Sequence, residues 1–353
     1  MGPIDFSKFK AIKNEYAKAF DYAELFGRIT GLEKKYPDFN SFIAIFSSQT
    51  VLKNIVMADE KKLPVFKKQF DNCTVQFDNG RCDFVKDKKD CGDCKTCREN
   101  KRKKAFHNEI MAILNYKTKG KNAIRKVYPK IGIKTCYICN AQYALSVQPE
   151  KKNKKGNSVQ KRYSAKFQFD HYFPKEKYPG LSISLYNLLP ICSGCNLIKR
   201  NQEIGIDFLA SDTDKWTNKF TFKIVERTLS SFLLHQKPLE IDFIDNHTYP
   251  DGMTKLADRY DIKGIYNTQI DLVEELITRK IKYSETYKDK LSASFSGIFT
   301  NTTIEERIIL GTYDQEKGIH KRPMSKFLQD INVQLDAYFQ QIIKEDKKSP
   351  EVI

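Results

Sequence analysis

The sequence predicts an α+β protein in which mostly helical N- and C-terminal regions flank a central module of short strands and cysteine pairs. Two observations lead to this fold class. Apolar residues recur at three- and four-residue intervals near both ends of the chain, which is the spacing of one helix face. Between 131 and 210 the pattern changes to strand-like alternation beside two Cys-x-x-Cys pairs, which are typical of zinc-binding turns.

The composition is that of a globular protein with more than one core. The chain has 353 residues, of which 40% are hydrophobic and 30% charged, and single cores stop growing at about 250 to 300 residues. Lysine and arginine number 61 against 44 acidic residues, a net charge of +17 that favours a polyanionic partner, with nucleic acid as the first candidate. A basic but simply solvated surface is the alternative that charge alone leaves open.

Targeting signals and cysteine usage indicate a cytoplasmic protein. The N-terminal segment lacks the apolar stretch of a signal peptide, and Phe6 stands where a myristoylation motif requires Ser or Thr. No apolar run reaches the length of a membrane-spanning helix, so we expect no membrane partner. The chain has nine cysteines, most of them in Cys-x-x-Cys spacing, which fits metal thiolates in a reducing compartment better than disulfides.

Four regions follow one another along the chain. Residues 1–72 carry helical spacing with glycine and proline breaks, and residues 73–130 combine a cysteine-rich insert with a basic helix. Residues 131–210 form the central module. Residues 211–353 begin with a mixed pattern and end in helices, because apolar residues again recur at helical intervals.

The central module contains a hairpin and a strand that ends in two polar residues. QYALSVQ and YSAKFQF are strand-like runs on either side of the lysine-rich segment PEKKNKKGNSVQKR, which predicts a hairpin with a basic loop. The second run continues into Asp170 and His171. Neighbours on a strand point to opposite faces, so these side chains can share a site only if the strand ends there. Pro174 and Pro179 favour such an end.

Two Cys-x-x-Cys pairs enclose this hairpin. Each pair offers two thiolates on a rigid turn, and four thiolates at about 2.3 Å complete a tetrahedral zinc site. We therefore expect a structural zinc, with buried apolar cysteines as the alternative. Such a closed site has no open position, so this zinc is not expected to be the catalyst. The expected ligands are Cys136, Cys139, Cys192 and Cys195.

The segment CNLIKRNQ, which follows the second pair, predicts the start of a helix. Asn196, Lys199 and Arg200 stand at i, i+3 and i+4 and should therefore share one face. We expect Lys199 and Arg200 to contact the phosphates of a nucleic acid rather than perform chemistry. A polar helix face beside a structural zinc is the alternative.

Residues 135–202 together resemble the HNH (ββα-metal) endonuclease family, in the form with a Cys-x-x-Cys pair on each side of the active hairpin. The Asp-His pair, a central Asn, the final ligand position and both cysteine pairs occur in the family's order. The resemblance implies that His171 is the general base and Asp170 a ligand of the catalytic cation. It also implies that Asn187 braces the loop that bears the histidine, and that Asn196 is the second protein ligand, in the place of the motif's final His or Asn.

General chemistry agrees with these roles. An imidazole with a pKa near about 6.5 is mostly neutral at about pH 7 and can accept a proton from water. A carboxylate and an amide oxygen form a hard, sparse ligand set that favours Mg²⁺ or Mn²⁺. The sequence thus predicts a metal-dependent endonuclease that hydrolyses phosphodiester bonds, with DNA as the favoured substrate. An RNA-cleaving enzyme and an inactive, zinc-stabilised nucleic-acid-binding module are the alternatives.

A second group of cysteines precedes the module. A further structural zinc held by four of them is the leading expectation, and unmetallated cysteines come next. The last three are also spaced closely enough for iron-sulfur ligation. The group consists of Cys73, Cys82, Cys91, Cys94 and Cys97.

Three features outside the motif concern partners. The basic runs ENKRKKAFH and PEKKNKKGNSVQKR could contact a nucleic-acid backbone, although lysine runs are often just solvated. The segment GTYDQEKGIHKRPMSKFLQDI is similar to tails that follow this kind of HNH module in bacterial proteins, which implies a companion ATPase and a role in antiviral defence. We also expect the long amphipathic flanks to dock a partner, with packing onto the module as the plainer explanation.

Overall fold

Two compact units, each assembled from separate stretches of the chain, make up the protein. The N-terminal unit comprises residues 6–132 and 145–204, and the C-terminal unit comprises residues 1–5, 133–144 and 205–353. Helices and small antiparallel two-stranded sheets build them, so the predicted α+β class is confirmed. The computed structural model describes residues 2–73, 77, 85–86, 89–148, 150–152, 158–160, 164–209, 219–283, 285–295 and 307–346.

Two early helices of the N-terminal unit begin where a side chain caps the helix. Helix α2 (Tyr22–Thr30) follows Asp21, whose carboxylate accepts hydrogen bonds from two backbone amides at 3.1 and 3.0 Å. Helix α4 (Gln49–Val56) follows Ser48, whose hydroxyl accepts one at 3.1 Å. Such caps are each worth about 1 kcal/mol. The same stretch contains α1 (Ser7–Ala17), η1 (Pro37–Phe39), α3 (Asn40–Ile43) and α5 (Lys62–Asp71).

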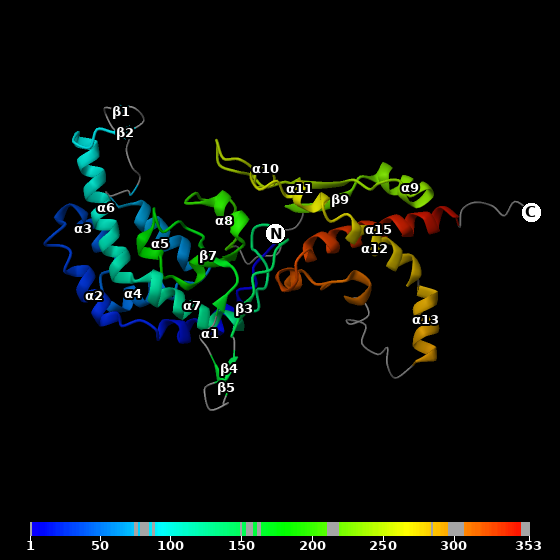
Figure 1. Cartoon of the computed structure of the whole chain (residues 1–353), viewed down its shortest axis with the longest axis horizontal. Coiled ribbons are helices and arrows are strands. Elements are labelled where there is room, and N and C mark those ends of the chain that lie inside the picture. Colours follow the sequence, from blue (N-terminus) through cyan, green and yellow to red (C-terminus); the bar gives the residue numbers. More distant parts are fainter. Residues whose placement is uncertain are drawn as a thin grey trace, which may run out of the picture. The chain divides into compact units, whose positions relative to one another are not determined.

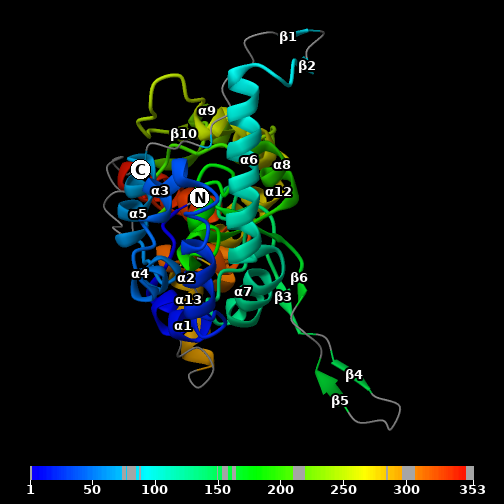
Figure 2. The same cartoon turned by 90° about the vertical axis from the view of Figure 1, so that its left-hand side faces the viewer.

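Helix α6 (Lys95–Leu114), the long cyan helix in Figures 1 and 2, packs against these helices through an aromatic cluster. The ring centroid of Phe42 lies 5.0 Å from that of Phe70 and 5.5 Å from that of Phe106. The loop that follows β7 meets this cluster at Gly180, where a Cβ atom would lie 2.3 Å from the Phe70 ring. Only glycine allows this approach, which seats the loop of the central motif on the core.

The start of α6 differs from the sequence prediction. We expected a cysteine-rich insert followed by a basic helix, but the helix begins at Lys95, within the cysteine-rich segment, with Cys94 as its cap residue. The basic run ENKRKKAFH therefore lies in the middle of the helix. Strands β1 (Val85–Lys86) and β2 (Lys89–Asp90) pair before it, and a π-helical turn (Tyr116–Gly120), α7 (Lys121–Val127) and η3 (Tyr128–Lys130) follow it.

The predicted hairpin is confirmed. Strand β3 (Ser146–Val147) pairs with β6 (Ser164–Ala165), and β4 (Glu150–Lys152) pairs with β5 (Ser158–Gln160), both antiparallel. Figure 2 shows the β4–β5 pair continuing beyond β3 and β6. The tip of the basic loop, 153–157, lies outside the described residues.

The run YSAKFQFDH forms two strands rather than the single strand we expected. Strand β6 ends at Ala165, and β7 (Gln168–His171) begins after a bend and pairs with β8 (Leu188–Ile191). Phe167 and Phe169 both pack on Tyr128, with ring centroids 4.8 and 5.2 Å from it. Phe167 precedes β7 and Phe169 belongs to it, so these contacts position β7. Strand β6 pairs with β3 instead of β8. The helix α8 (Ser193–Lys199) follows β8, so the order β7, β8, α8 completes a ββα unit.

In the C-terminal unit a helix covers the edge of a two-stranded sheet. Strand β9 (Phe220–Ile224) pairs with β10 (Ile241–Asp245), and α15 (Ser325–Asp346) packs against β9 (Figure 1). Asp330 accepts a hydrogen bond from the Phe222 amide at 3.0 Å, and Gln334 bonds both the amide and the carbonyl of Ile224, at 2.7 and 2.9 Å. These side chains pair backbone groups that an edge strand would leave open.

The C-terminal unit contains further helices. They are α9 (Glu226–His235), α10 (Leu256–Arg259), α11 (Ile262–Asn267), α12 (Asp271–Lys282), α13 (Glu285–Ser294) and η7 (Glu316–Lys321). Within the described part of the chain, none of the helices combines the length and the apolar character needed to cross a membrane.

A buried polar network ties the segment 133–144 into the C-terminal unit. The hydroxyl of Thr135 lies 3.1 Å from Nδ1 of His320 and accepts a hydrogen bond from the Asn140 amide at 3.0 Å. Asn140 also donates to the carbonyl of Ile319 at 2.9 Å. Nε2 of His320 lies 3.4 Å from the carbonyl oxygen of Gly2, so both ring nitrogens have partners.

Candidate active site

The end of strand β7 brings Asp170 and His171 into one cavity. Asp170 pairs with Leu189 and His171 with Leu188 across the strands, and β7 ends at His171, as predicted. Because the strand ends there, the two neighbouring side chains both line a cavity of about 380 Å³ within the N-terminal unit. Asn196 and Arg200 line the same cavity, together with Phe169, Pro174, Lys175, Glu176 and Asn201.

The imidazole of His171 is held in one orientation. Its Nε2 lies 3.0 Å from the carbonyl oxygen of Ser182, and a carbonyl can only accept, so Nε2 carries the proton and Nδ1 is an acceptor. The ring of Tyr116 packs against it edge-on, with 4.3 Å between centroids. The residue is 6% exposed. The histidine thus presents one defined tautomer at the wall of the cavity.

The pKa of His171 is lowered to about 3; burial is the largest cause, the positive charges of Lys175, Lys199 and Lys121 act in the same direction, and the hydrogen bond to Ser182 opposes them. Desolvation disfavours the charged imidazolium, and nearby cations disfavour it again. The side chain is therefore neutral at about pH 7, which is the form that accepts a proton.

Asn187 holds the loop that follows the histidine. Its Oδ1 accepts a hydrogen bond from the amide of Phe173 at 2.7 Å. Its Nδ2 donates to the carbonyl oxygens of Phe173 at 3.1 Å and Leu181 at 3.0 Å. The side chain is fully buried, so these bonds are shielded from water. Because Ser182 follows Leu181 directly, Asn187 also fixes the carbonyl that orients His171.

Lys199 does not lie where the sequence analysis put it. Its side chain is 0% exposed, and its ammonium group pairs with Oδ1 of Asp170 at 3.1 Å and donates to the carbonyl of His171 at 3.0 Å. It therefore cannot present its charge to phosphate from the helix surface. We expected Asn196, Lys199 and Arg200 on one face, but Lys199 shares the buried face of α8 with Cys195, four residues earlier.

Asn196 and Arg200 share the other face of α8 and line the cavity. The Asn196 amide nitrogen donates to Oε1 of Gln168, which leaves its Oδ1 as the atom for a ligand role. Arg200 is exposed and ends the helix with φ of 53° and ψ of −126°. This backbone conformation costs a non-glycine residue about 1 to 3 kcal/mol, and such conformations cluster at functional sites.

Three residues that the sequence analysis did not single out complete the site. Ser182 provides the carbonyl that orients His171, Tyr116 packs on the imidazole ring, and Lys175 lines the cavity and lowers the pKa of the histidine. The roles of Ser182 and Tyr116 could not be predicted from the local sequence. Ser182 acts through its backbone carbonyl, which every residue type has, and Tyr116 comes from the turn after α6, far from the motif in sequence. Lys175 lies four residues after His171, and its proximity to the motif was the available signal.

The four cysteines assigned to the first zinc come together. The sulfur atoms of Cys136, Cys139, Cys192 and Cys195 all lie within 4.8 Å of one another. Four thiolates at about 2.3 Å from a tetrahedral ion lie about 3.8 Å apart, so the group fits the expected geometry. The sulfur of Cys192 also accepts a hydrogen bond from the Cys195 amide at 3.4 Å, which stabilises a thiolate. This group could hold a structural metal ion such as zinc.

Three cysteines of the second group also come together. The sulfur atoms of Cys91, Cys94 and Cys97 lie within 4.8 Å of one another, and the amides of Cys94 and Cys97 each donate to the preceding sulfur at 3.4 Å. Cys73 lies in the core, where its sulfur bonds to the carbonyls of Ser41 and Gln69. Cys82 lies outside the described residues. The three thiols could hold a second metal ion.

The cavity also has donors that suit a divalent cation. The carboxylate of Asp170 and the Oδ1 of Asn196 could serve as oxygen ligands, and they come from two different elements that line the cavity. A site with only a few oxygen ligands suits Mg²⁺ or Mn²⁺, because these ions keep several bound water molecules and also bind substrate oxygens. The donor set therefore fits the predicted cation, although one carboxylate oxygen of Asp170 already pairs with Lys199.

Comparison with family models, with curated proteins and with solved structures finds no match for this chain. The function is therefore inferred from the residues of the cavity.

Proposed function

We propose that this protein is a metal-dependent HNH endonuclease that hydrolyses phosphodiester bonds, with DNA as the favoured substrate. One observation carries the proposal. A neutral imidazole with a fixed tautomer lines the same cavity as a carboxylate and an amide oxygen, on a β-β-α arrangement of strands and helix. Hydrolysis of a phosphodiester needs a proton acceptor for water and oxygen ligands for a cation, and this cavity has both.

In this proposal His171 accepts a proton from the attacking water at Nδ1. The Nε2 proton stays on the hydrogen bond to Ser182, so the ring cannot turn away from the cavity. A pKa of about 3 alone makes the imidazole a weak base. An anionic phosphate in the cavity would oppose the charges of Lys175 and Lys199 and raise this pKa toward the range of an effective base.

Asp170 and Asn196 would hold the divalent cation, which when bound supplies charge to stabilise the phosphate in the transition state. Lys175 and Arg200 line the cavity as cations and would contact phosphate oxygens. Lys199 and Asn187 act as positioning residues. Lys199 joins the carboxylate of Asp170 to the backbone of His171, and Asn187 fixes the loop around Ser182.

The cation ligands can be tested by metal titration. Plasmid DNA and structured RNA are digested with Mg²⁺, Mn²⁺ or EDTA by the wild type, Asp170→Ala and Asn196→Ala. The control is Lys53→Ala, on an exposed position of α4 that lies outside this cavity. We expect cleavage that EDTA abolishes, and ligand variants that need more metal and recover partly in Mn²⁺.

Other outcomes of this assay would contradict or change the proposal. Metal curves identical to wild type in both ligand variants would contradict the assigned ligand roles. Digestion of RNA but not DNA would shift the substrate, and binding without any cleavage would favour the inactive binding module.

The defence role and the companion ATPase belong to the same proposal and rest on the similarity of residues 311–331 to tails of bacterial defence proteins. Purification of the chain alone and together with the products of its neighbouring genes tests them. We expect an ATPase to co-purify and to change the specific nuclease activity at equal salt. A monomer that cleaves at the full rate with nothing bound would contradict this part.

A further inference from the structure

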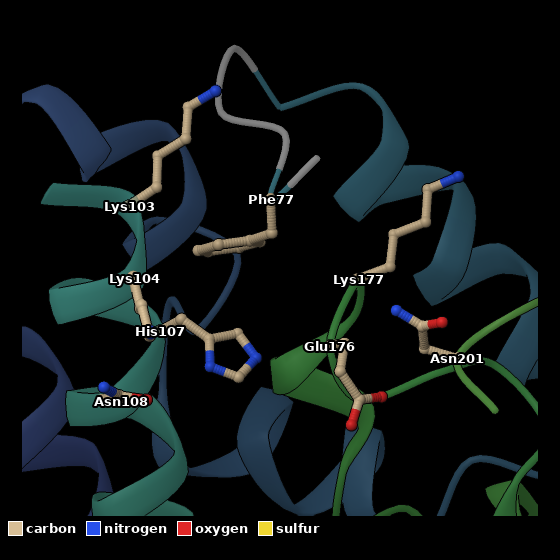
Figure 3. A pocket seen from close by; sticks show the side chains of 8 residues that line it. All are labelled: Phe77, Lys103, Lys104, His107, Asn108, Glu176, Lys177 and Asn201. Atoms are coloured by element: carbon tan, nitrogen blue, oxygen red, sulfur yellow. The ribbon is translucent and has the colours of Figure 1, made fainter. Parts of the chain in front are cut away.

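A second cavity adjoins the one around His171 in the same unit. It has a volume of about 470 Å³ and shares Glu176 and Asn201 with the first cavity. Its remaining lining residues come mainly from α6, where Lys103, Lys104 and His107 face it, as Figure 3 shows. The two cavities therefore lie next to each other, with these two residues in the wall of both.

Two aromatic rings form one wall of this second cavity. The centroids of Phe77 and His107 lie 5.5 Å apart, with the ring planes at 70°. Phe77 is parallel to the buried Phe106, with 6.1 Å between their centroids. Nε2 of His107 lies 3.0 Å from the carbonyl oxygen of Lys175. Both rings are therefore held in place before any ligand binds, which reduces the entropy that binding would cost.

The charges around the cavity are arranged unevenly. Figure 3 shows Lys103 and Lys177 on opposite sides, with Phe77 and His107 between them. Lys104 adds a third cation. Glu176 lies at the boundary with the first cavity, where its carboxylate pairs with Lys175 at 2.5 Å. A phosphate fits beside the lysines but not beside Glu176, whereas a carboxylate can accept hydrogen bonds from the amino groups of a nucleobase.

We propose that this cavity binds one unpaired nucleotide of the substrate strand, next to the phosphate that occupies the cavity of His171. Its base packs against His107 and Phe77, and its neighbouring phosphates contact Lys103, Lys104 and Lys177. The volume lies within the range of about 300 to 1,000 Å³ that ligand pockets occupy. This inference rests on the proposed function for its substrate class, but it concerns binding and not hydrolysis.

The geometry predicts which form of DNA binds. A base inside a duplex is covered on both faces by its neighbours, so it can contact a protein ring only after it is unstacked. Single strands offer such bases without this cost, and stacking on aromatic side chains is their usual mode of recognition. We therefore expect the protein to bind single-stranded or locally opened DNA more tightly than an intact duplex.

The test measures binding of a fluorescent single-stranded DNA oligonucleotide to the full chain in EDTA, where no hydrolysis occurs. A series of oligonucleotides carries one abasic site at successive positions. In the wild type, the abasic site at one position should weaken binding at least about fivefold, which is the low end of a stacking contact. His107→Ala should weaken binding of the normal strand to a similar degree and abolish this position dependence.

Two further variants separate stacking from charge. His107→Phe keeps a ring and should retain the position dependence, although it cannot bond to Lys175. Lys103→Ala with Lys104→Ala should reduce the dependence of log affinity on log salt by about 0.7 for each phosphate that the lysines no longer neutralise. Lys53→Ala removes one positive charge away from both cavities and should leave the abasic profile unchanged.

An abasic profile that is flat in the wild type, or that persists in His107→Ala, would overturn the inference. Equal affinity for duplex and single-stranded DNA would do the same. Failure of the nuclease proposal has a different signature, because a protein without cleavage in Mg²⁺ can still show base-dependent binding in EDTA. Circular dichroism of each variant establishes that weaker binding does not reflect unfolding.

Discussion

His171 and His320 are both buried, and burial lowers the pKa of each to about 3. Their surroundings are otherwise different. His320, in the C-terminal unit, has partners at both ring nitrogens, the hydroxyl of Thr135 and the carbonyl of Gly2. His171, in the N-terminal unit, is fixed at Nε2 by Ser182 and lines a cavity together with Asp170. His320 is thus a structural polar group, whereas His171 has the surroundings that our proposed general base requires.

This difference shows that a perturbed pKa does not by itself identify a catalytic histidine. Desolvation acts on any buried imidazole, whatever lies beside it. What distinguishes His171 is a ring nitrogen left as an acceptor, a cavity that can admit substrate, and oxygen ligands in the same wall. The supports of the two residues differ as well. A buried ion pair of Lys199 and Asp170 supports His171, whereas neutral hydrogen bonds support His320.

Loss of the first metal ion should lower stability more than any other change, and it should affect the surroundings of both histidines. Thr135, the partner of His320, directly precedes Cys136, and α8, which carries Lys199, begins directly after Cys192. Cys136→Ser and Cys195→Ser should each lower the zinc content by about one per chain. Structural zinc contributes about 10 kcal/mol or more to folding, so both regions should lose stability. Elemental analysis and thermal unfolding measure this, and Cys73→Ala is the control for the zinc content, because the sulfur of Cys73 lies in the core and outside both clusters of cysteine sulfur atoms. Pure wild-type protein without zinc would contradict the prediction.

Lys199→Met should cause the next largest loss of stability. It should distinguish the ion pair that supports His171 from the neutral hydrogen bonds that support His320. It leaves the carboxylate of Asp170 buried without its cation, which costs about 3 to 5 kcal/mol. Thr135→Val, which removes the neutral support of His320, should cost only about 1 to 3 kcal/mol. Urea unfolding of both variants measures the free energies.

The double variant Asp170→Asn with Lys199→Met is the matched control, because it removes both charges and should recover part of the stability. If Lys199→Met were as stable as the wild type, the ion pair would not be the support we describe.

His171→Ala should lower the cleavage rate at least about a hundredfold, the scale of a lost general base, which corresponds to about 2.7 kcal/mol. Its zinc content and unfolding curve should stay close to wild type. His320→Gln should retain the cleavage rate per folded molecule, since the amide can keep the hydrogen bonds of the ring. Plasmid cleavage in Mg²⁺ measures both. A large loss in His320→Gln together with full activity in His171→Ala would reverse the comparison.

The smallest effect, over the measured range from about pH 6.5 to pH 5, is that of pH on stability. The pKa of His320 is about 3 in the folded protein and about 6.5 in the unfolded chain. The unfolded state therefore binds a proton that the folded state does not, and stability falls as pH falls from about 6.5 toward about 3, by about 1.4 kcal/mol per pH unit for each such histidine. His320→Gln should make the loss between about pH 6.5 and pH 5 shallower. Urea midpoints at several pH values measure this slope, and replacement of the exposed His235 by Gln should leave it unchanged.

Local patterns in the sequence predicted the elements that depend on neighbours along the chain. The hairpin between 146 and 165, the end of β7 at His171 and the helices of the flanks follow from alternation, prolines and helical spacing. The cysteine groups were also predictable, because two-residue spacing places two sulfur atoms on one turn. In contrast, the break between β6 and β7 depends on packing against Tyr128, which lies far away in sequence.

The sequence by itself determined which residue types are present in the motif, their order, and the α+β class. Only the tertiary structure decided which of them face the cavity. The spacing of Asn196, Lys199 and Arg200 is compatible with one helix face, but the fold buries Lys199 beside Cys195 and turns it toward Asp170. The sequence of this helix alone does not determine which of its faces becomes buried. That choice depends on the free energy of burying distant groups against it, and here the carboxylate on β7 offsets part of the cost of burying the charge of Lys199.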